Sequence, residues 1–169
     1  KIVIATRPDK FLPQMAGEFR PSRKVINIYF SLEKSFFASP MIGLVTDKQF
    51  LVNNLVFMTD VSKSYYKTGR ALLSVSITKP VAADDKLVEM VKIELEALTK
   101  IKSEHFKLIK TYEIEEALPQ VDDMKSSISA TNTKIYDHVF LAGDYLLNGS
   151  INAAMTAGRM AAQAVILSI

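Results

Sequence analysis

Hydrophobic and polar positions alternate along several short segments in the middle of the chain. The clearest segment runs from Arg70 to Thr78, where Leu73, Val75 and Ile77 alternate with serine and threonine. This alternation predicts a strand with one buried face. Hydrophobic, β-branched and aromatic residues predict further strands at 24–32, 42–46, 50–59 and 107–114. Because no long helix separates the first four strands, we expect antiparallel pairing in a sheet of about five strands.

One long amphipathic helix is predicted from Asp85 to about Lys102. Asp84 precedes it and is suited to accept a hydrogen bond from the first turn as the N-cap. A shorter helix is expected from Asp9 to Glu18. The long helix has charged residues on one side and hydrophobic residues at helical spacing on the other, namely Val88, Val91, Leu95 and Leu98. A sheet with one helix packed against it predicts the α+β fold class.

The two ends of the chain follow a different pattern. A short hydrophobic strand is expected at Ile2–Ala5, before the turn residues Thr6, Arg7 and Pro8. Near the other end, a hydrophobic strand at 139–142 stops at Gly143 and Asp144, and an alanine-rich helix begins after Ser150. A carboxylate at a strand end therefore lies close in sequence to a helix N-terminus, which offers free N–H groups and partial positive charge. This combination suits a polar, electron-rich ligand such as a nucleotide or a flavin.

The residues of this last segment resemble a known element. They read Phe-Leu-Ala-Gly-Asp-Tyr at 140–145, Gly-Ser-Ile-x-x-Ala at 149–154 and Ala-Gly-Arg-x-Ala-Ala at 157–162. The pattern is similar to the C-terminal flavin motif of the flavin-containing amine oxidoreductase superfamily, which includes phytoene desaturases, protoporphyrinogen oxidases and monoamine oxidases. The match is nearest to the desaturase-like members. The strand at the start of the chain and the Leu-Pro pair at 118–119 resemble the same superfamily more loosely.

The resemblance implies how the chain is organised. Residues 1–8 would be a strand returning from an FAD-binding domain, 9–134 a substrate-binding domain and 135–169 the C-terminal FAD-binding motif. The α+β class then comprises a mixed, mainly antiparallel substrate-domain sheet with its amphipathic helix, plus a strand and C-terminal helix of an FAD-binding domain. No G-x-G-x-x-G follows any strand, so we expect the phosphate-binding βαβ unit of such a protein upstream of Lys1.

The same resemblance implies a cofactor site. Its residues are Gly143, Asp144, Gly149, Ser150, Ile151 and Ala154. The Asp144 carboxylate would accept a hydrogen bond from the flavin ribityl chain, and the N–H groups that open the last helix would face the pyrimidine edge. The structural alternatives are a simple turn at Asp144 and an ordinary N-cap at Ser150. Both interpretations can hold at Ser150, because an N-cap hydroxyl does not use every free N–H. Catalytic residues stay unknown, since no Ser/His/Asp set is evident.

The implied activity is that of an FAD-dependent oxidoreductase that moves a hydride from a substrate C–H bond to flavin N5. The substrate would be an apolar or amine small molecule. Ser150 stands where aromatic-cage amine oxidases have tyrosine, which disfavours that reaction type, and Asn152 replaces a common glutamate. Two alternatives remain open: a non-catalytic binding or scaffold module derived from this fold, and a generic α+β ligand-binding domain. Alone, the chain is expected to bind FAD non-covalently, weakly or not at all, and to self-associate as a homo-oligomer.

Composition narrows the functional classes further. The 49% hydrophobic content and mean hydropathy of +0.14 predict a surface that packs on something else. The net charge is only +3 and the basic residues are dispersed, which disfavours a nucleic-acid partner. Without cysteine there are no disulfides or thiolate ligands, and the two histidines are far apart, so no metal site is expected. The chain has no hydrophobic run of membrane-spanning length and no signal peptide, so the cytoplasm is the expected location.

Overall fold

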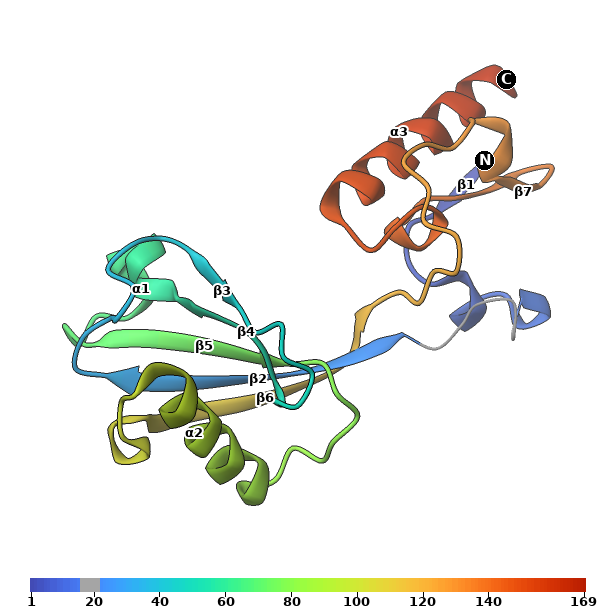
Figure 1. Cartoon of the computed structure of the whole chain (residues 1–169). Helices are drawn as coiled ribbons and strands as arrows, with labels where there is room; N and C mark the ends of the chain where they lie inside the picture. Colours follow the sequence, from blue (N-terminus) through green and yellow to red (C-terminus); the bar gives the residue numbers. More distant parts are fainter. Residues whose placement is uncertain (16–21) are drawn as a thin grey trace. The chain divides into compact units, whose positions relative to one another are not determined.

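The computed structural model describes residues 1–15 and 22–169, which form two compact units (Figure 1). We call residues 1–23 and 116–169 the end unit, because it combines both ends of the chain. Residues 24–115 form the middle unit. Whether these units correspond to a substrate-binding domain and part of an FAD-binding domain stays a prediction.

A five-stranded sheet forms the middle unit, in the spatial order β3-β4-β5-β2-β6. Its strands are β2 (Arg23–Leu32), β3 (Ile42–Leu44), β4 (Val52–Phe57), β5 (Ala71–Ile77) and β6 (Lys107–Leu118). The pairs β3–β4, β4–β5 and β2–β5 are antiparallel, as the sequence predicts for strands without crossover helices.

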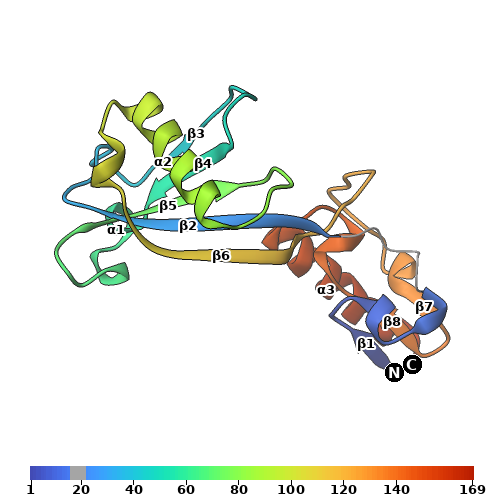
Figure 2. The same ribbon diagram turned by 90° about the horizontal axis from the view of Figure 1, so that it is seen from below.

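The alternating pattern places hydrophobic side chains on one face of this sheet, where α2 (Asp85–Thr99) covers them (Figure 2). Val75 lies opposite Ile28 in the register, and both side chains are fully buried. From α2, Val91 and Leu95 are fully buried against the same core. Each such burial stabilises the fold by about 1.5–3 kcal/mol. This hydrophobic contact therefore fixes which face of the sheet the helix covers.

The sequence predicts α2 well at its start and less well at its end. The Asp84 carboxylate accepts a hydrogen bond of 2.9 Å from the backbone N–H of Leu87, which confirms the N-cap. The helix ends at Thr99 because Lys100 adopts the left-handed conformation, with φ of 63°. Leu98, predicted on the buried face, is 37% exposed. The buried stripe is therefore shorter than the spacing suggested.

Three other expectations need correction. The predicted helix from Asp9 to Glu18 is absent over its described part, which instead forms the 3-10 turns η1 (Pro8–Lys10) and η2 (Pro13–Met15). Pro13 lacks an N–H and its ring clashes with a continuing α-helix, and residues 16–18 lie outside the described residues. The predicted strand at 50–59 ends at Phe57, where the short helix α1 (Met58–Val61) begins. Farther along, β6 extends four residues beyond its predicted end at Ile114.

The end unit contains a three-stranded sheet in the order β1-β8-β7. The strands are β1 (Ile2–Ile4), β8 (Val139–Leu141) and β7 (Lys134–Tyr136). The predicted terminal strands β1 and β8 lie side by side and pair in parallel, with Val3 opposite Phe140. The sequence analysis did not predict β7, because its residues Lys-Ile-Tyr follow a polar segment and include one aliphatic side chain.

The alanine-rich helix α3 (Ile151–Leu167) packs on this sheet. Ala161 and Phe140 belong to one buried hydrophobic cluster, and Ala153 and Ala157 are also buried. Ala154 is exposed, and a Cβ added to Gly158 would meet no atom within 4 Å. Close packing therefore explains only part of the small-residue pattern. With its segregated antiparallel sheet and helices, the structure confirms the α+β class. None of the described helices is long and apolar enough to span a membrane.

Candidate functional site

The site begins where β8 ends. Gly143 follows the strand and precedes the 3-10 turn η6 (Asp144–Leu146). A Cβ on Gly143 would lie only 2.2 Å from Cε1 of the Tyr145 ring. Glycine is therefore required here because the aromatic ring lies directly against the backbone. The Tyr145 hydroxyl has two possible acceptors for its one proton, the carbonyl oxygens of Thr6 and Ala142, at 3.5 and 3.4 Å.

The environment of Tyr145 alters its acidity. Burial, helped by the nearby carboxylates of Asp144 and Asp9, raises the pKa of Tyr145 to about 12. Both causes disfavour the phenolate, because a buried negative charge loses hydration and is repelled by like charges. Tyr145 is therefore a neutral hydrogen-bond donor throughout the physiological pH range.

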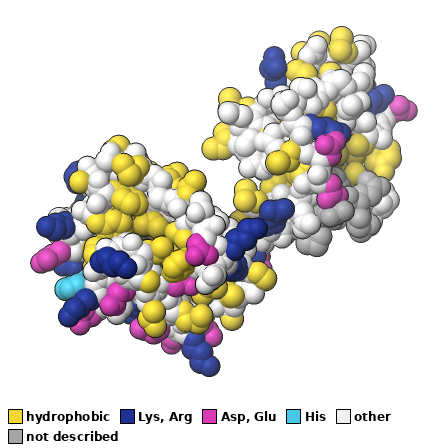
Figure 3. Space-filling view, in the orientation of Figure 1, with side chains coloured by type: hydrophobic (Ala, Val, Ile, Leu, Met, Phe, Trp, Pro, Cys, Tyr) yellow, Lys and Arg dark blue, Asp and Glu magenta, His cyan; other side chains and the backbone are white. Residues whose placement is uncertain are grey.

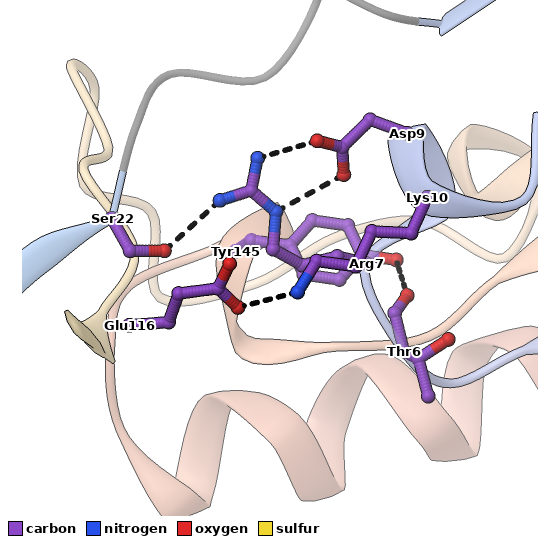
Figure 4. Close-up of polar contacts among 7 residues, drawn as sticks. All are labelled: Thr6, Arg7, Asp9, Lys10, Ser22, Glu116 and Tyr145. Atoms are coloured by element: carbon purple, nitrogen blue, oxygen red, sulfur yellow. Dashed lines mark hydrogen bonds and ion pairs between the residues drawn. The ribbon is translucent and has the colours of Figure 1, made fainter. Parts of the chain in front are cut away.

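An ion-pair network lies beside Tyr145 in the end unit (Figure 4). The Arg7 guanidinium donates to both carboxylate oxygens of Asp9, at 3.0 and 2.7 Å, and to the Ser22 hydroxyl at 3.0 Å. Lys10 pairs with Glu116 at 2.8 Å. The hydrogen bonds from Arg7 hold the pKa of Asp9 below its usual value, and Asp9 in turn raises the pKa of Arg7. This bidentate geometry fixes the turn that follows β1.

Arg7, Asp144 and Tyr145 line one open hollow of about 390 Å³ in the end unit. Pro119 and Asp122 contribute to its wall from the segment after β6. The volume is within the range of small-molecule sites, about 300–1,000 Å³. Sequence reasoning selected Asp144 but missed Arg7 and Tyr145. The adjacency of Tyr145 to the Gly-Asp pair was the available signal, whereas the Thr6–Tyr145 contact joins distant parts of the sequence.

The start of α3 forms the second part of the site. The Ser150 hydroxyl accepts a hydrogen bond from the Ala153 N–H at 3.1 Å, which confirms the N-cap. It also donates to the Asn148 side chain at 2.6 Å. Within the described part of the chain, the backbone N–H groups of Ile151 and Asn152 have no acceptor. The cap thus leaves two donors and the positive helix end available to a ligand.

The turn before α3 is held by its neighbours. The Asn148 side-chain amide donates to the carbonyl oxygen of Lys125 at 2.7 Å. A Cβ on Gly149 would lie 3.1 Å from Cδ of Pro119, tighter than ordinary packing. The Leu-Pro segment therefore lies against the turn that opens α3.

The structure brings the six predicted site residues together in two groups. Gly143 and Asp144 lie at the start of η6, which packs against α3. Gly149, Ser150 and Ile151 are consecutive at the start of α3. Ile151 is 80% exposed, and Ala154 is exposed one turn farther along. Of the six, Asp144 lines the hollow that also contains Tyr145.

Among the residues that the structure describes, no group of His, Asp or Glu side chains could hold a metal ion. His105 and His138 belong to different units. The chemistry available at the site is therefore that of a carboxylate, a phenol, a guanidinium and backbone N–H donors.

Comparison with known proteins shows similarity at the level of structure. The sequence matches no family model and no curated protein. An oxidoreductase from Methanosarcina mazei matches 93% of this chain with a TM-score of 0.63 and 12% identity. An Exiguobacterium sp. 255-15 protein described as a protoporphyrinogen oxidase matches 96%, with a TM-score of 0.61 and 13% identity. Putrescine oxidase matches 95%, with a TM-score of 0.52 and 11% identity.

These similarities establish a shared fold. The chain spans only 37%, 39% and 38% of the lengths of those three proteins. At such low identity, the comparison carries no substrate or residue role to this chain.

Proposed function

We propose that this chain provides the flavin-contacting turn and helix, together with a substrate-binding sheet, of an FAD-dependent oxidoreductase. The proposal rests on the C-terminal motif and on a fold shared with oxidoreductases. The observation that carries it is the start of α3, where Ser150 caps one N–H and leaves those of Ile151 and Asn152 without acceptors in the described structure.

The residues present fit a flavin in their donor and acceptor chemistry. Asp144, half-buried at the strand end, offers a carboxylate that can accept hydrogen bonds from ribityl hydroxyls. The first N–H groups of α3 suit the carbonyl oxygens and ring nitrogen of a pyrimidine edge. Gly149 has no side chain to cover these donors. With FAD bound, the cofactor would supply hydride acceptance from a substrate C–H bond.

The chain's own groups would bind the ring and modulate its charge. A positive helix end favours nearby negative charge by about 0.3–1 kcal/mol at an exposed position. Asp144 would fix the orientation of the polyol chain through hydrogen bonds. An apolar or amine substrate, bound by the middle unit, completes the proposal, and the protein's main contribution would be to position both partners.

The test is flavin content in the full-length gene product. We expect it to purify with FAD or to take it up on incubation. Asp144→Ala should weaken FAD binding roughly 10- to 100-fold, since a hydrogen bond to a charged group is worth about 1.5–3 kcal/mol. Flavin absorbance and fluorescence quenching would measure both binding and occupancy.

Asp137→Ala is the matched control, because Asp137 is an exposed carboxylate of the same unit whose one ion-pair partner among the described residues is Lys134. Its FAD affinity should equal that of the wild type. A full-length product that takes up no FAD would refute the proposal and favour the non-catalytic module. Equal losses in both variants would remove Asp144 from the cofactor site.

A further inference from the structure

One end of the middle-unit sheet carries a concentration of positive charge. Here β2 ends, α1 follows β4 and β5 begins (Figure 1). These elements surround an open hollow of about 830 Å³, which we call the basic hollow. Its cationic lining residues are Lys34, Lys63, Lys67 and Arg70. A smaller hollow of about 440 Å³ shares Lys34 and Arg70 and adds Lys107.

This concentration is unusual for a chain whose charges are otherwise balanced. The whole sequence has 21 basic and 18 acidic residues. The two hollows together have five cationic side chains and only two carboxylates, those of Glu33 and Asp60. Figure 3 shows Lys and Arg side chains gathered at this end of the middle unit. A concave surface with a positive excess attracts anions more strongly than dispersed charges do.

The cations are not neutralised by neighbouring carboxylates. Within the described part of the chain, no ion pair involves Lys34, Lys63, Lys67 or Arg70. Asp60 instead accepts a hydrogen bond of 2.5 Å from the Ser35 hydroxyl. Among the described residues, these four positive groups therefore have no carboxylate within ion-pair distance.

Arg70 is oriented for binding. Its Nε donates to the hydroxyl of Ser31 at 2.8 Å, and Ser31 is only 5% exposed. This anchor fixes the plane of the guanidinium, while its two terminal nitrogens have no hydrogen-bond partner among the described residues. A planar pair of N–H donors matches two oxygens of a phosphate.

A second part of the wall of the basic hollow, at Ser35 and Ala38, is also fixed. The Ser35 hydroxyl accepts hydrogen bonds from the N–H groups of Phe37 and Ala38, both at 3.1 Å. Ala38 has a φ of 51°, in the left-handed region that non-glycine residues rarely adopt. Through Asp60, these bonds tie the loop after β2 to α1. The wall is thus built by specific contacts and does not depend on the surface lysines.

We infer that the basic hollow binds a phosphate-bearing small molecule, with Arg70 as the bidentate contact and Lys34, Lys63 and Lys67 as additional cations. The phosphoryl group can belong to a soluble phosphate ester or to a lipid headgroup. The site lies within the middle unit and does not rest on the proposed flavin function. Its volume exceeds that of a phosphate ion, so an organic portion of the ligand has room.

Titration calorimetry with pyrophosphate would test the site. We expect saturable binding by the chain and a loss of at least about tenfold in affinity for Arg70→Gln. Arg70→Lys keeps the charge but removes the planar fork, so its loss should be nearly as large. Lys86→Gln is the matched control, because Lys86 is exposed in the first turn of α2 and lines neither hollow. Its affinity should change by less than about twofold.

Vesicle sedimentation would distinguish the two sources of phosphate. Phosphatidylcholine vesicles with and without phosphatidic acid would be compared, using the same variants. Sedimentation that requires both phosphatidic acid and Arg70 assigns a lipid headgroup. Pyrophosphate binding without sedimentation assigns a soluble ester. Binding of neither probe, wild-type affinity in Arg70→Lys, or an equal loss in Lys86→Gln would overturn the inference. Thermal unfolding of each variant would check that the fold is retained.

Discussion

At the scale of single residues, Tyr145 connects the two ends of the chain. Its ring lies on Gly143 and its hydroxyl reaches the carbonyl oxygen of Thr6, beside β1. Since the ring also lines the hollow with Asp144, its neutral state affects both stability and the site. Ionisation would place a second negative charge beside Asp144.

The raised pKa of Tyr145 predicts a stability change at alkaline pH. The folded pKa is about 12, whereas an unfolded tyrosine ionises near pH 10. The contribution of the protonated phenol is therefore fully present below about pH 10 and is lost as pH rises through the folded value. Denaturant unfolding of wild type and Tyr145→Phe should show a wild-type advantage that shrinks across this window.

Ultraviolet titration provides the control for that assignment. Tyr145→Phe should remove the tyrosine that ionises at the highest pH and leave the others unchanged. If the substitution instead removes a component near pH 10, the environment described for Tyr145 is wrong.

At the scale of elements, α2 illustrates what local sequence determines. Asp84 was predictable as an N-cap because its bond to Leu87 spans three residues. The buried positions Val91 and Leu95 follow from helical spacing. The exposure of Leu98 did not follow, because helical spacing does not show which of the equivalent positions the rest of the fold covers. The cap at Ser150 was likewise predictable, because its bond to Ala153 spans three residues. The bond from Arg7 to Ser22 was not, because it joins residues that only the folded chain brings together.

The two leucines near the end of α2 predict a measurable difference in stability. Leu95→Ala should lower the free energy of unfolding by about 2–5 kcal/mol, because it leaves a cavity at a fully buried position. Leu98→Ala changes the same side chain on the same helix at a position that is 37% exposed. Its cost should be below about 1 kcal/mol. Equal costs in urea unfolding would contradict the packing of α2 described above.

At the scale of the whole molecule, the two units differ in the quality of their cores. Every buried residue of the large core cluster lies within residues 24–115. The end unit has two small clusters built mainly from alanines. Its helix α3 exposes large hydrophobic side chains, including Ile151 at 80% and Met155 at 69%. The pairing of β1 with β8 could not be predicted from periodicity alone, because the hydrophobic pattern of a strand does not show which distant strand it pairs with.

This difference between the two hydrophobic cores predicts that the middle unit folds on its own. A polypeptide of residues 24–115 should unfold cooperatively in urea, and Leu95→Ala should lower its midpoint because the core is complete within it.

In the whole chain, hydrogen exchange should be slower in β2, β4, β5 and α2 than in β1, β8 and α3, since protection follows buried apolar contact. The end unit should be the part through which the chain self-associates, because α3 exposes large apolar side chains such as Ile151 and Met155. An unfolded 24–115 polypeptide, or equal exchange in the two units, would show that the middle unit depends on the ends of the chain for its stability.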